Sequence, residues 1–572
     1  MEIKKIITTF TAVLEHLYLT FIMITKLKIQ LVFIALIFTS LLQAQQLFLP
    51  LDHDENAFVE MYLSDVDVNS HTSIKPYFYQ DVKNVINIDS IDSTVTDTNR
   101  LYLLPTSNWA KFLMWSENKL LDEDLVYVNQ PDLKLRANML LGLNAGSDTY
   151  LKESFWNNTR GYWLSGQIGK KVFFESAFYE NQAKLLPYIS QYANSNFVVP
   201  GQGRFKLFKE GAGADWGFSS GAVGYKPSKF FTAFVGHGKN FLGDGYRSLL
   251  LSDNSFNYPY FKLETTVWNI KYVNLWAQLS HIGFQNAADR NWTQKYLAVH
   301  YLSWNATKRL NIGLYESVSW LKADKGFDWQ YMNPIIFMRP VEWQNGSADN
   351  VLLGANVKFK VNDNVSIYGQ AVLDDLKFSE LKKADGYWGN KYGGQIGVKA
   401  YNLFKVYGLS AQAEYNVVRP FTYTHFDSAN AHTHMNEPLA HPLGANFQEA
   451  IGIVRYKYKR HKFTLKVVWS EIGRDTSSVN HGGDIFYSYN TNRVDINGDE
   501  GLTGYGIAQG DLNKLNYLDA RYGFMVNPRA RLYFEIGLKD RSLSKHYGSD
   551  SQNRFVYFGL RTTLNNTYND HF

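Results

Sequence analysis

From about residue 131 to its last residue, the chain alternates apolar and polar side chains in segments of about ten residues. In residues 531–539, for example, Phe534 and Ile536 fall on one face, while Tyr533 and Glu535 fall on the other. Successive side chains of a β-strand point to opposite faces, so each segment predicts a strand with one apolar face. A charge that faces lipid is costly, so we expect the apolar faces to contact lipid and the polar faces to line a barrel.

The connections between these segments alternate between short and long. This alternation favours a transmembrane barrel over a soluble sandwich, because outer-membrane barrels have short periplasmic turns and long extracellular loops. Counting the segments predicts an all-β fold, a transmembrane antiparallel β-barrel of about 18 strands over residues 131–572. We expect the long loops to fill the lumen in part. The long connections are 181–213, 239–258, 321–348, 419–446 and 471–511, and the short ones include 169–170, 268–269, 362–363 and 527–528.

One residue breaks the pattern. Glu316 falls on the apolar face of residues 310–320, where a carboxylate would meet lipid, and nothing nearby in the sequence accounts for it.

The two ends of the chain resemble an export signal and a barrel assembly signal. Lys26 and Lys28 precede an apolar stretch that ends at Ala44, so residues 1–44 are predicted to be a secretory signal peptide, with residues 1–22 an over-extended start. The alternative is an N-terminal membrane anchor. The strand predicted over residues 555–564, followed by Phe572, is similar to the assembly signal of bacterial outer-membrane barrels.

Residues 45–130 lack the alternating pattern. We interpret them as a small N-terminal segment that is either periplasmic or folded against the barrel mouth, and extra strands of the same sheet are the alternative.

Composition narrows the possible functions. Aromatic residues make up 16% of the chain and charged residues 19%, with a net charge of +5 and no block of Lys or Arg, so nucleic acid is not an expected partner. The absence of Cys excludes disulfides, thiolate metal sites and Cys nucleophiles.

Motifs for enzymatic chemistry are weak. Residues 217–221 match G-x-S-x-G around Ser219, but the chain continues as a strand, whereas a nucleophile elbow needs a helix after the Ser. We therefore expect no enzyme and no cofactor, and an outer-membrane hydrolase remains an alternative.

Two groups of residues are weak candidates for metal binding. His432 and His434 lie two residues apart in a long loop, a spacing that can bind a divalent metal. Asp495, Asn497 and Asp499 resemble the first half of a calcium loop, but the position of the bidentate Glu is occupied by a glycine. Loop hydrogen bonding for the histidines and an Asp/Asn/Gly turn for the second group explain these residues better, so we predict no metal site.

Two loops combine aromatic, Arg and acidic side chains, which stack on and hydrogen-bond to sugars. The same residues can instead brace a loop in the lumen, and Asp244 and Arg247 are close enough in sequence to form an ion pair. The candidate ligand-binding or bracing residues are Asp244, Tyr246, Arg247, Trp329, Arg339, Glu342 and Trp343.

Three loop motifs carry a family resemblance: GHGKNFLGDGYRS at 236–248, NPIIFMRPVE at 333–342 and PLAHPLGAN at 438–446. With them the chain, from about residue 70 onward, resembles a family of outer-membrane barrels of gliding bacteria, the RemB-like motility proteins, and is similar to the Wzi-like capsule assembly proteins. The resemblance implies an 18-stranded barrel at the cell surface that anchors polysaccharide or supports gliding. It supplies no catalytic residue.

Together these features predict a non-enzymatic barrel of the bacterial outer membrane that supports gliding motility, or the attachment or assembly of a surface polysaccharide. Expected partners are outer-membrane lipid, surface polysaccharide and motility or secretion machinery. A diffusion porin is the first alternative, and an outer-membrane hydrolase is the second.

Overall fold

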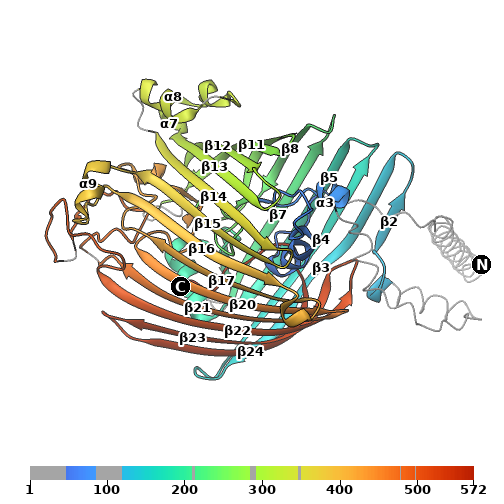
Figure 1. The fold of residues 1–572 in the computed structure, drawn as a ribbon. Coiled ribbons are helices and arrows are strands. Elements are labelled where there is room, and N and C mark those ends of the chain that lie inside the picture. The colour runs from blue at the N-terminus through green and yellow to red at the C-terminus, as the bar shows by residue number, and fades with distance from the viewer. Residues whose placement is uncertain are drawn as a thin grey trace, which may run out of the picture.

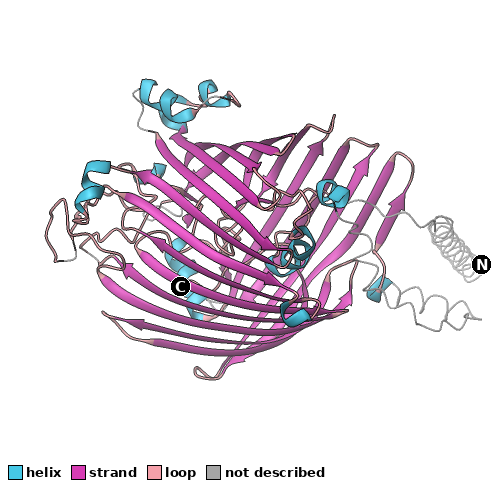
Figure 2. Cartoon of the chain, in the orientation of Figure 1, coloured by secondary structure: helices cyan, strands magenta, loops and turns pink. Residues whose placement is uncertain are grey.

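The protein is a closed β-barrel. The structure, a computed structural model, describes residues 47–85, 119–208, 213–283, 292–335, 337–345, 349–476, 478–495 and 497–572, so the predicted signal peptide lies outside the described residues. Within these ranges, eighteen long antiparallel strands form one ring (Figures 1 and 2). The predicted fold class is confirmed. No helix in the same ranges is long and apolar enough to cross a bilayer.

The barrel strands are β3 (Leu133–Asp148), β4 (Glu153–Ile168), β5 (Val172–Lys184), β7 (Gly213–Tyr225), β8 (Phe231–Gly238), β10 (Tyr258–Val267), β11 (Ile270–His281), β12 (Thr293–Asn305), β13 (Leu310–Leu321), β14 (Asn350–Asn362), β15 (Val365–Asp375), β16 (Lys391–Tyr401), β17 (Leu409–Val418), β20 (Phe447–Tyr458), β21 (His461–Arg474), β22 (Asp511–Asn527), β23 (Leu532–Lys545) and β24 (Ser551–Thr562). Each strand pairs with the next, and β24 pairs with β3 to close the ring. Two short strands, β2 (Val126–Asn129) and β6 (Lys206–Phe208), pair with β3 and β7.

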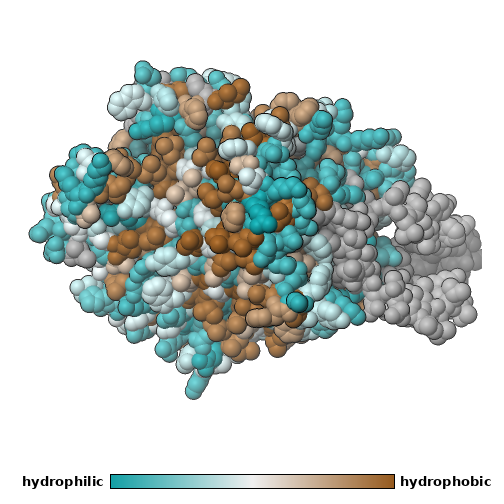
Figure 3. Space-filling view, in the orientation of Figure 1, coloured by the Kyte–Doolittle hydropathy of each residue, from teal (hydrophilic) through white to brown (hydrophobic). Residues whose placement is uncertain are grey.

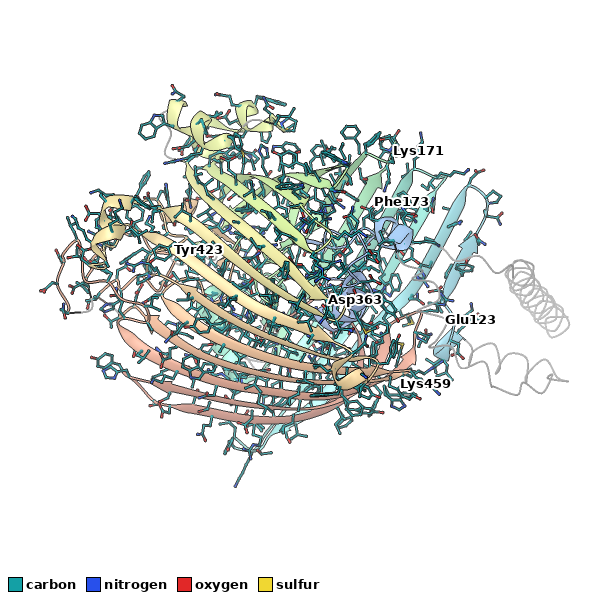
Figure 4. All side chains as sticks on the ribbon, viewed as in Figure 1. Glu123, Lys171, Phe173, Asp363, Tyr423 and Lys459 are labelled. Carbon is teal, nitrogen blue, oxygen red and sulfur yellow. The ribbon has the colours of Figure 1, made fainter. Side chains whose placement is uncertain are left out.

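The two ends of the barrel differ as the loop lengths predict. Lys171, Asp363 and Lys459, labelled in Figure 4, lie in short turns at one end, and Tyr423 lies in a long loop toward the other. The loops at the long-loop end carry α6 (Pro187–Asn196), α7 (Lys322–Lys325), η1 (Trp329–Met332), α8 (Met338–Asn345), α9 (Phe378–Lys383), η3 (Ser428–Asn430), β18 (Thr433–His434) and β19 (Glu437–Pro438). One short turn contains η2 (Leu403–Lys405).

Most strands turn an apolar face outward. On β23, Phe534 and Ile536 are exposed on the outer surface, while Tyr533 and Glu535 are buried on the lumen side. Figure 3 shows apolar side chains gathered over the strands that face the viewer. The predicted alternation of an apolar outer face and a polar inner face therefore holds for strands such as β23.

Strand β11 is reversed, and our expectation that its apolar face meets lipid is wrong. Val273, Leu275 and Leu279 point into the lumen, where they pack in one buried cluster with Leu249 and Leu251 of a loop. The lumen next to β11 is therefore filled by apolar side chains, so an apolar inner face is favourable there.

Residues 47–85, here called the plug, lie inside the ring of strands (Figure 1). The plug contains α2 (His53–Leu63), β1 (Ile74–Lys75) and α3 (Tyr79–Val85), and β1 pairs with β9 (Phe241–Leu242) of a loop. Its Phe48 and Phe78 rings pack 5.0 Å and 5.6 Å from the ring of Phe234 on the wall.

The last ten residues, 563–572, here called the tail, also run into the lumen. Asn565 bridges to Leu51 of the plug, and the Tyr568 hydroxyl donates to Asp253, 2.6 Å away. Phe572 stacks on Tyr192 of α6 at 4.5 Å. Phe572 thus lies ten residues beyond the last strand, which ends at Thr562. The predicted assembly signal requires an aromatic residue at the end of the last strand, and Phe572 does not lie there.

Candidate functional site

A buried ion network joins a loop, the wall and the tail at the centre of the lumen. The Arg247 guanidinium donates to Glu449 of β20 and to Asp570 of the tail, each at 3.0 Å, and all three side chains are fully buried. His441 lies 2.8 Å from Glu449, and the Tyr246 hydroxyl donates to Asp570 at 2.9 Å. Tyr246 and Arg247 therefore brace the interior and are not accessible to a ligand.

Asp244 belongs to a different set of contacts. It accepts hydrogen bonds from Thr72 of the plug and, at 2.9 Å, from Asn356 of β14, and it lies 3.7 Å from the Lys358 ammonium. The ion pair that we predicted between Asp244 and Arg247 does not form, because each side chain bonds to other partners.

Helix α2 of the plug is bound to the wall through three carboxylates. Asp54 contacts Arg455 at 2.8 Å, and Glu55 contacts Lys457 at 2.9 Å. Glu60 contacts Lys399 of β16 at 2.6 Å. The first turn of a helix stabilises negative charge, which suits Asp54 and Glu55. The inner wall at this level is basic, and the plug neutralises it.

His432 and His434 serve the packing of the loop that fills the lumen. His432 lies 3.2 Å from the Leu250 carbonyl, and His434 accepts a hydrogen bond from the Ser280 amide at 3.0 Å. Burial lowers the pKa of both side chains from 6.5 to about 3. Among the described residues, no group of three or more His, Asp or Glu is arranged to hold a metal.

We expect these two histidines to make the protein sensitive to acid. Below pH 6.5 the unfolded chain protonates them and the folded chain does not, so stability falls as the pH decreases toward 3. Each histidine contributes a slope of about 1.4 kcal/mol per pH unit in this window. The double variant His432→Gln, His434→Gln should lose less stability than the wild type when the pH falls from 6.5, as measured by urea denaturation at each pH. Replacing the exposed His546 by Gln is the matched control and should leave the slope unchanged.

The other two motifs are structural. The Asp495 carboxylate accepts from the amides of Asn497, at 2.8 Å, and Asp499, at 2.9 Å, so these residues form a turn. Ser219 lies on the outer face of β7, exposed on the side away from the lumen. A nucleophile on that face has no enclosed site around it, so the geometry does not favour Ser219 as a catalytic residue.

The loop after β13 does not enter the lumen. Its described part, residues 322–335 and 337–345, is here called the flap, and it folds back over the outer wall (Figure 1). The amides of Met338 and Arg339 donate to the Glu316 carboxylate at 2.9 Å and 2.7 Å. Glu316 is thus an outward-facing residue that the flap covers, which explains its place on an apolar face.

The flap separates the remaining candidate residues from those in the lumen. Arg339 and Glu342 form an ion pair within α8, and Trp329 and Trp343 are exposed on the flap. The seven candidates therefore do not form one site. Asp244, Tyr246 and Arg247 are enclosed, and the other four lie outside the barrel.

A cavity of about 410 Å³ opens among the long loops, and its size lies within the range of small-molecule sites. We call it the mouth cavity. Arg541 lies over the ring of Tyr188 at 4.8 Å, and its Nε donates to the Phe572 backbone oxygen at 2.7 Å. Burial raises the pKa of Asp484 to about 6, so the cavity gains positive charge as the pH falls through that value. Its lining includes Tyr188, Tyr192, Phe486, Tyr547, Phe572, Arg474, Arg541, Lys545, Asp484 and Asp511.

Sequence reasoning missed the mouth cavity because five separate segments build it. It lies between α6, two long loops, the turn after β23 and the tail. The one local signal was that α6 and the two loops belong to long connections at the same end of the barrel.

No protein-family model matches the chain, and no curated protein matches it in sequence. Among solved structures, it is similar to Wzi of Escherichia coli, described as an outer membrane protein involved in group 1 capsule assembly and a carbohydrate-binding β-barrel. That match has 11% identity and a TM-score of 0.48, and covers 90% of this chain and 99% of Wzi. It is also similar to OpdK of Pseudomonas aeruginosa, solved with vanillate, at 11% identity and a TM-score of 0.41, covering 74% of this chain and 97% of OpdK.

Proposed function

We propose that the protein is a non-enzymatic barrel of the bacterial outer membrane that binds a surface polysaccharide at its mouth cavity and thereby supports capsule attachment or gliding. The observation that carries the proposal is the mouth cavity itself, with aromatic rings beside Arg474, Arg541, Asp484 and Asp511 at the long-loop end. Aromatic faces stack on sugar rings, and charged side chains hydrogen-bond to hydroxyl or carboxylate groups. A sugar polymer crossing the cell surface would meet this end first.

The filled lumen fits a binding role better than free diffusion. The plug and loop residues such as Leu250 and Leu443 form one continuous buried apolar cluster with the wall, and the tail bridges to the plug through Asn565 and Leu51. A polymer held at the mouth would therefore meet a closed surface beneath it.

We expect Tyr547→Ala to weaken polysaccharide binding about fivefold, since losing one stacking ring costs about 1 kcal/mol. Tyr547 is exposed at the cavity, so its replacement leaves the fold intact. Binding is measured by isothermal titration of the purified protein with polysaccharide extracted from the same cells. Trp343→Ala, on the flap, is the matched control and should bind like the wild type.

The porin and hydrolase alternatives predict different results. If the wild type fails to bind polysaccharide and conducts ions steadily in planar bilayers, the porin alternative replaces our proposal. A hydrolase would release sugar fragments from the bound polymer and lose that activity when a single Ser, His or Asp is replaced. Colony spreading of cells carrying the Tyr547→Ala protein then tests whether binding at the mouth cavity contributes to gliding.

A further inference from the structure

We propose that the flap is a membrane-interface element, which seats its exposed aromatic side chains among the lipids of the outer leaflet beside the barrel. The first observation is its position on the outer wall. The Trp276 indole donates to the Tyr331 carbonyl at 2.8 Å, and Asn274 donates to the Pro334 carbonyl at 3.0 Å. Both donors belong to the outward face of β11, opposite the face whose Leu275 packs into the lumen.

The flap is firmly attached to this wall. Its Tyr331 and Met338 form a buried apolar cluster with Trp276, Val318 and Trp320 of the strands. Glu316, only 7% exposed, accepts two backbone hydrogen bonds from the start of α8. The flap therefore lies beside the barrel as a fixed part of its side.

The surface that the flap turns away from the wall carries four large exposed apolar side chains. The exposed fractions are 75% for Trp329, 85% for Ile335, 75% for Phe337 and 72% for Trp343. All four side chains lie in a stretch of fifteen residues within the flap. The flap packs other side chains against the wall and leaves these four exposed. Tryptophan is enriched at membrane–water interfaces, where its ring is apolar and its N–H can remain hydrated.

Lipid is the occupant that the rest of the wall indicates. Next to the flap, Leu314 of β13 is exposed on the same outward face, two residues before Glu316. The flap surface is thus continuous with the lipid-facing belt of a transmembrane barrel. Its described charges balance, with Lys322, Lys325 and Arg339 against Asp324, Asp328 and Glu342, so it offers no net charge to attract an oppositely charged protein.

The absence of cysteine from the chain allows a direct test. We would prepare Trp329→Cys and Trp343→Cys in the full chain, label each with an environment-sensitive dye, and reconstitute them in phosphatidylcholine vesicles. A fraction of the lipid carries a nitroxide quencher on its acyl chain. Leu314→Cys serves as the lipid-facing reference and Tyr547→Cys as the reference at the mouth cavity, since both side chains are exposed.

We expect the dyes at positions 329 and 343 to lose emission to the lipid quencher as the dye at 314 does, and to emit at shorter wavelength than the dye at 547. Quenching at 329 and 343 no greater than at 547 would overturn the proposal. Protection of these positions from the lipid quencher, together with a doubled mass in native mass spectrometry, would also overturn it, because the flap would then contact a second copy. This result does not depend on polysaccharide binding, so either proposal can fail alone.

Discussion

Replacing Arg247 by Met is expected to destabilise the protein by about 3–5 kcal/mol, because it leaves two buried carboxylates without their shared cation. The guanidinium contacts Glu449 and Asp570, and none of the three side chains reaches solvent. Lys466 and His441 still contact these carboxylates, but neither can replace a charge that bridges both. The free energy of unfolding in urea, for protein refolded in detergent, measures the loss.

An exposed ion pair provides the control. Lys308 pairs with Asp67 of the plug, and their side chains are 74% and 80% exposed, so Lys308→Met should leave the free energy of unfolding almost unchanged. The triple variant Arg247→Met, Glu449→Gln, Asp570→Asn should recover part of the stability that Arg247→Met loses, since it removes the unpaired charges as well. Equal losses for Arg247→Met and Lys308→Met would show that the buried network does not stabilise the fold.

Deleting the plug, residues 47–85, is expected to open the blocked lumen and to make the barrel an anion-selective channel. The deletion removes partners from basic side chains of the inner wall, and a pore lined by unpaired positive charge attracts anions. Ion currents in planar bilayers, with the reversal potential in a salt gradient, measure both opening and selectivity. The wall residues that bond to the plug are Lys226, Lys271, Lys358, Lys360, Lys399, Arg455 and Lys457.

A milder change tests the same idea in a chain that keeps its plug. The variant Asp54→Asn, Glu55→Gln, Glu60→Gln removes the three carboxylates of α2 that contact the wall. We expect this variant to show brief channel openings more often than the wild type does. Asp67→Asn is the matched control, since Asp67 is exposed and contacts only the exposed Lys308 among the described ion pairs. Silent bilayers for both the deletion and the triple variant would mean that the loops and the tail alone block the lumen.

Local alternation predicted the barrel well and the site poorly. The alternation on β23 was enough to place Phe534 outside and Glu535 inside, because each face meets a uniform medium there. The inner and outer faces of β11 were predicted the wrong way round. The preference of Leu275 for the lumen depends on Leu250, which a distant loop brings there. A sequence pattern records that two faces differ, but the surrounding structure decides which face is inside.

The candidate residues failed for a related reason. Arg247 was a sound choice as a bracing residue, but its partners Glu449 and Asp570 are 202 and 323 residues away in the chain. Glu316 breaks the alternating sequence pattern because its hydrogen-bond donors, the amides of Met338 and Arg339, belong to the flap. Neither partnership has a local signal, because both form only when the ring of strands fixes which loops meet.

The closure between β3 and β24 has a consequence for the order of assembly. Seven residue pairs, from Phe555 with Asp148 to Arg561 with Gly142, join the first and last barrel strands around a plug that precedes them and a tail that follows them. Because the plug and the tail both lie inside the ring, we expect both segments to enter the lumen before this seam closes. The last step of folding would then be the pairing of β3 with β24, which encloses both segments at once. A variant in which these two strands pair early would exclude the tail from the lumen.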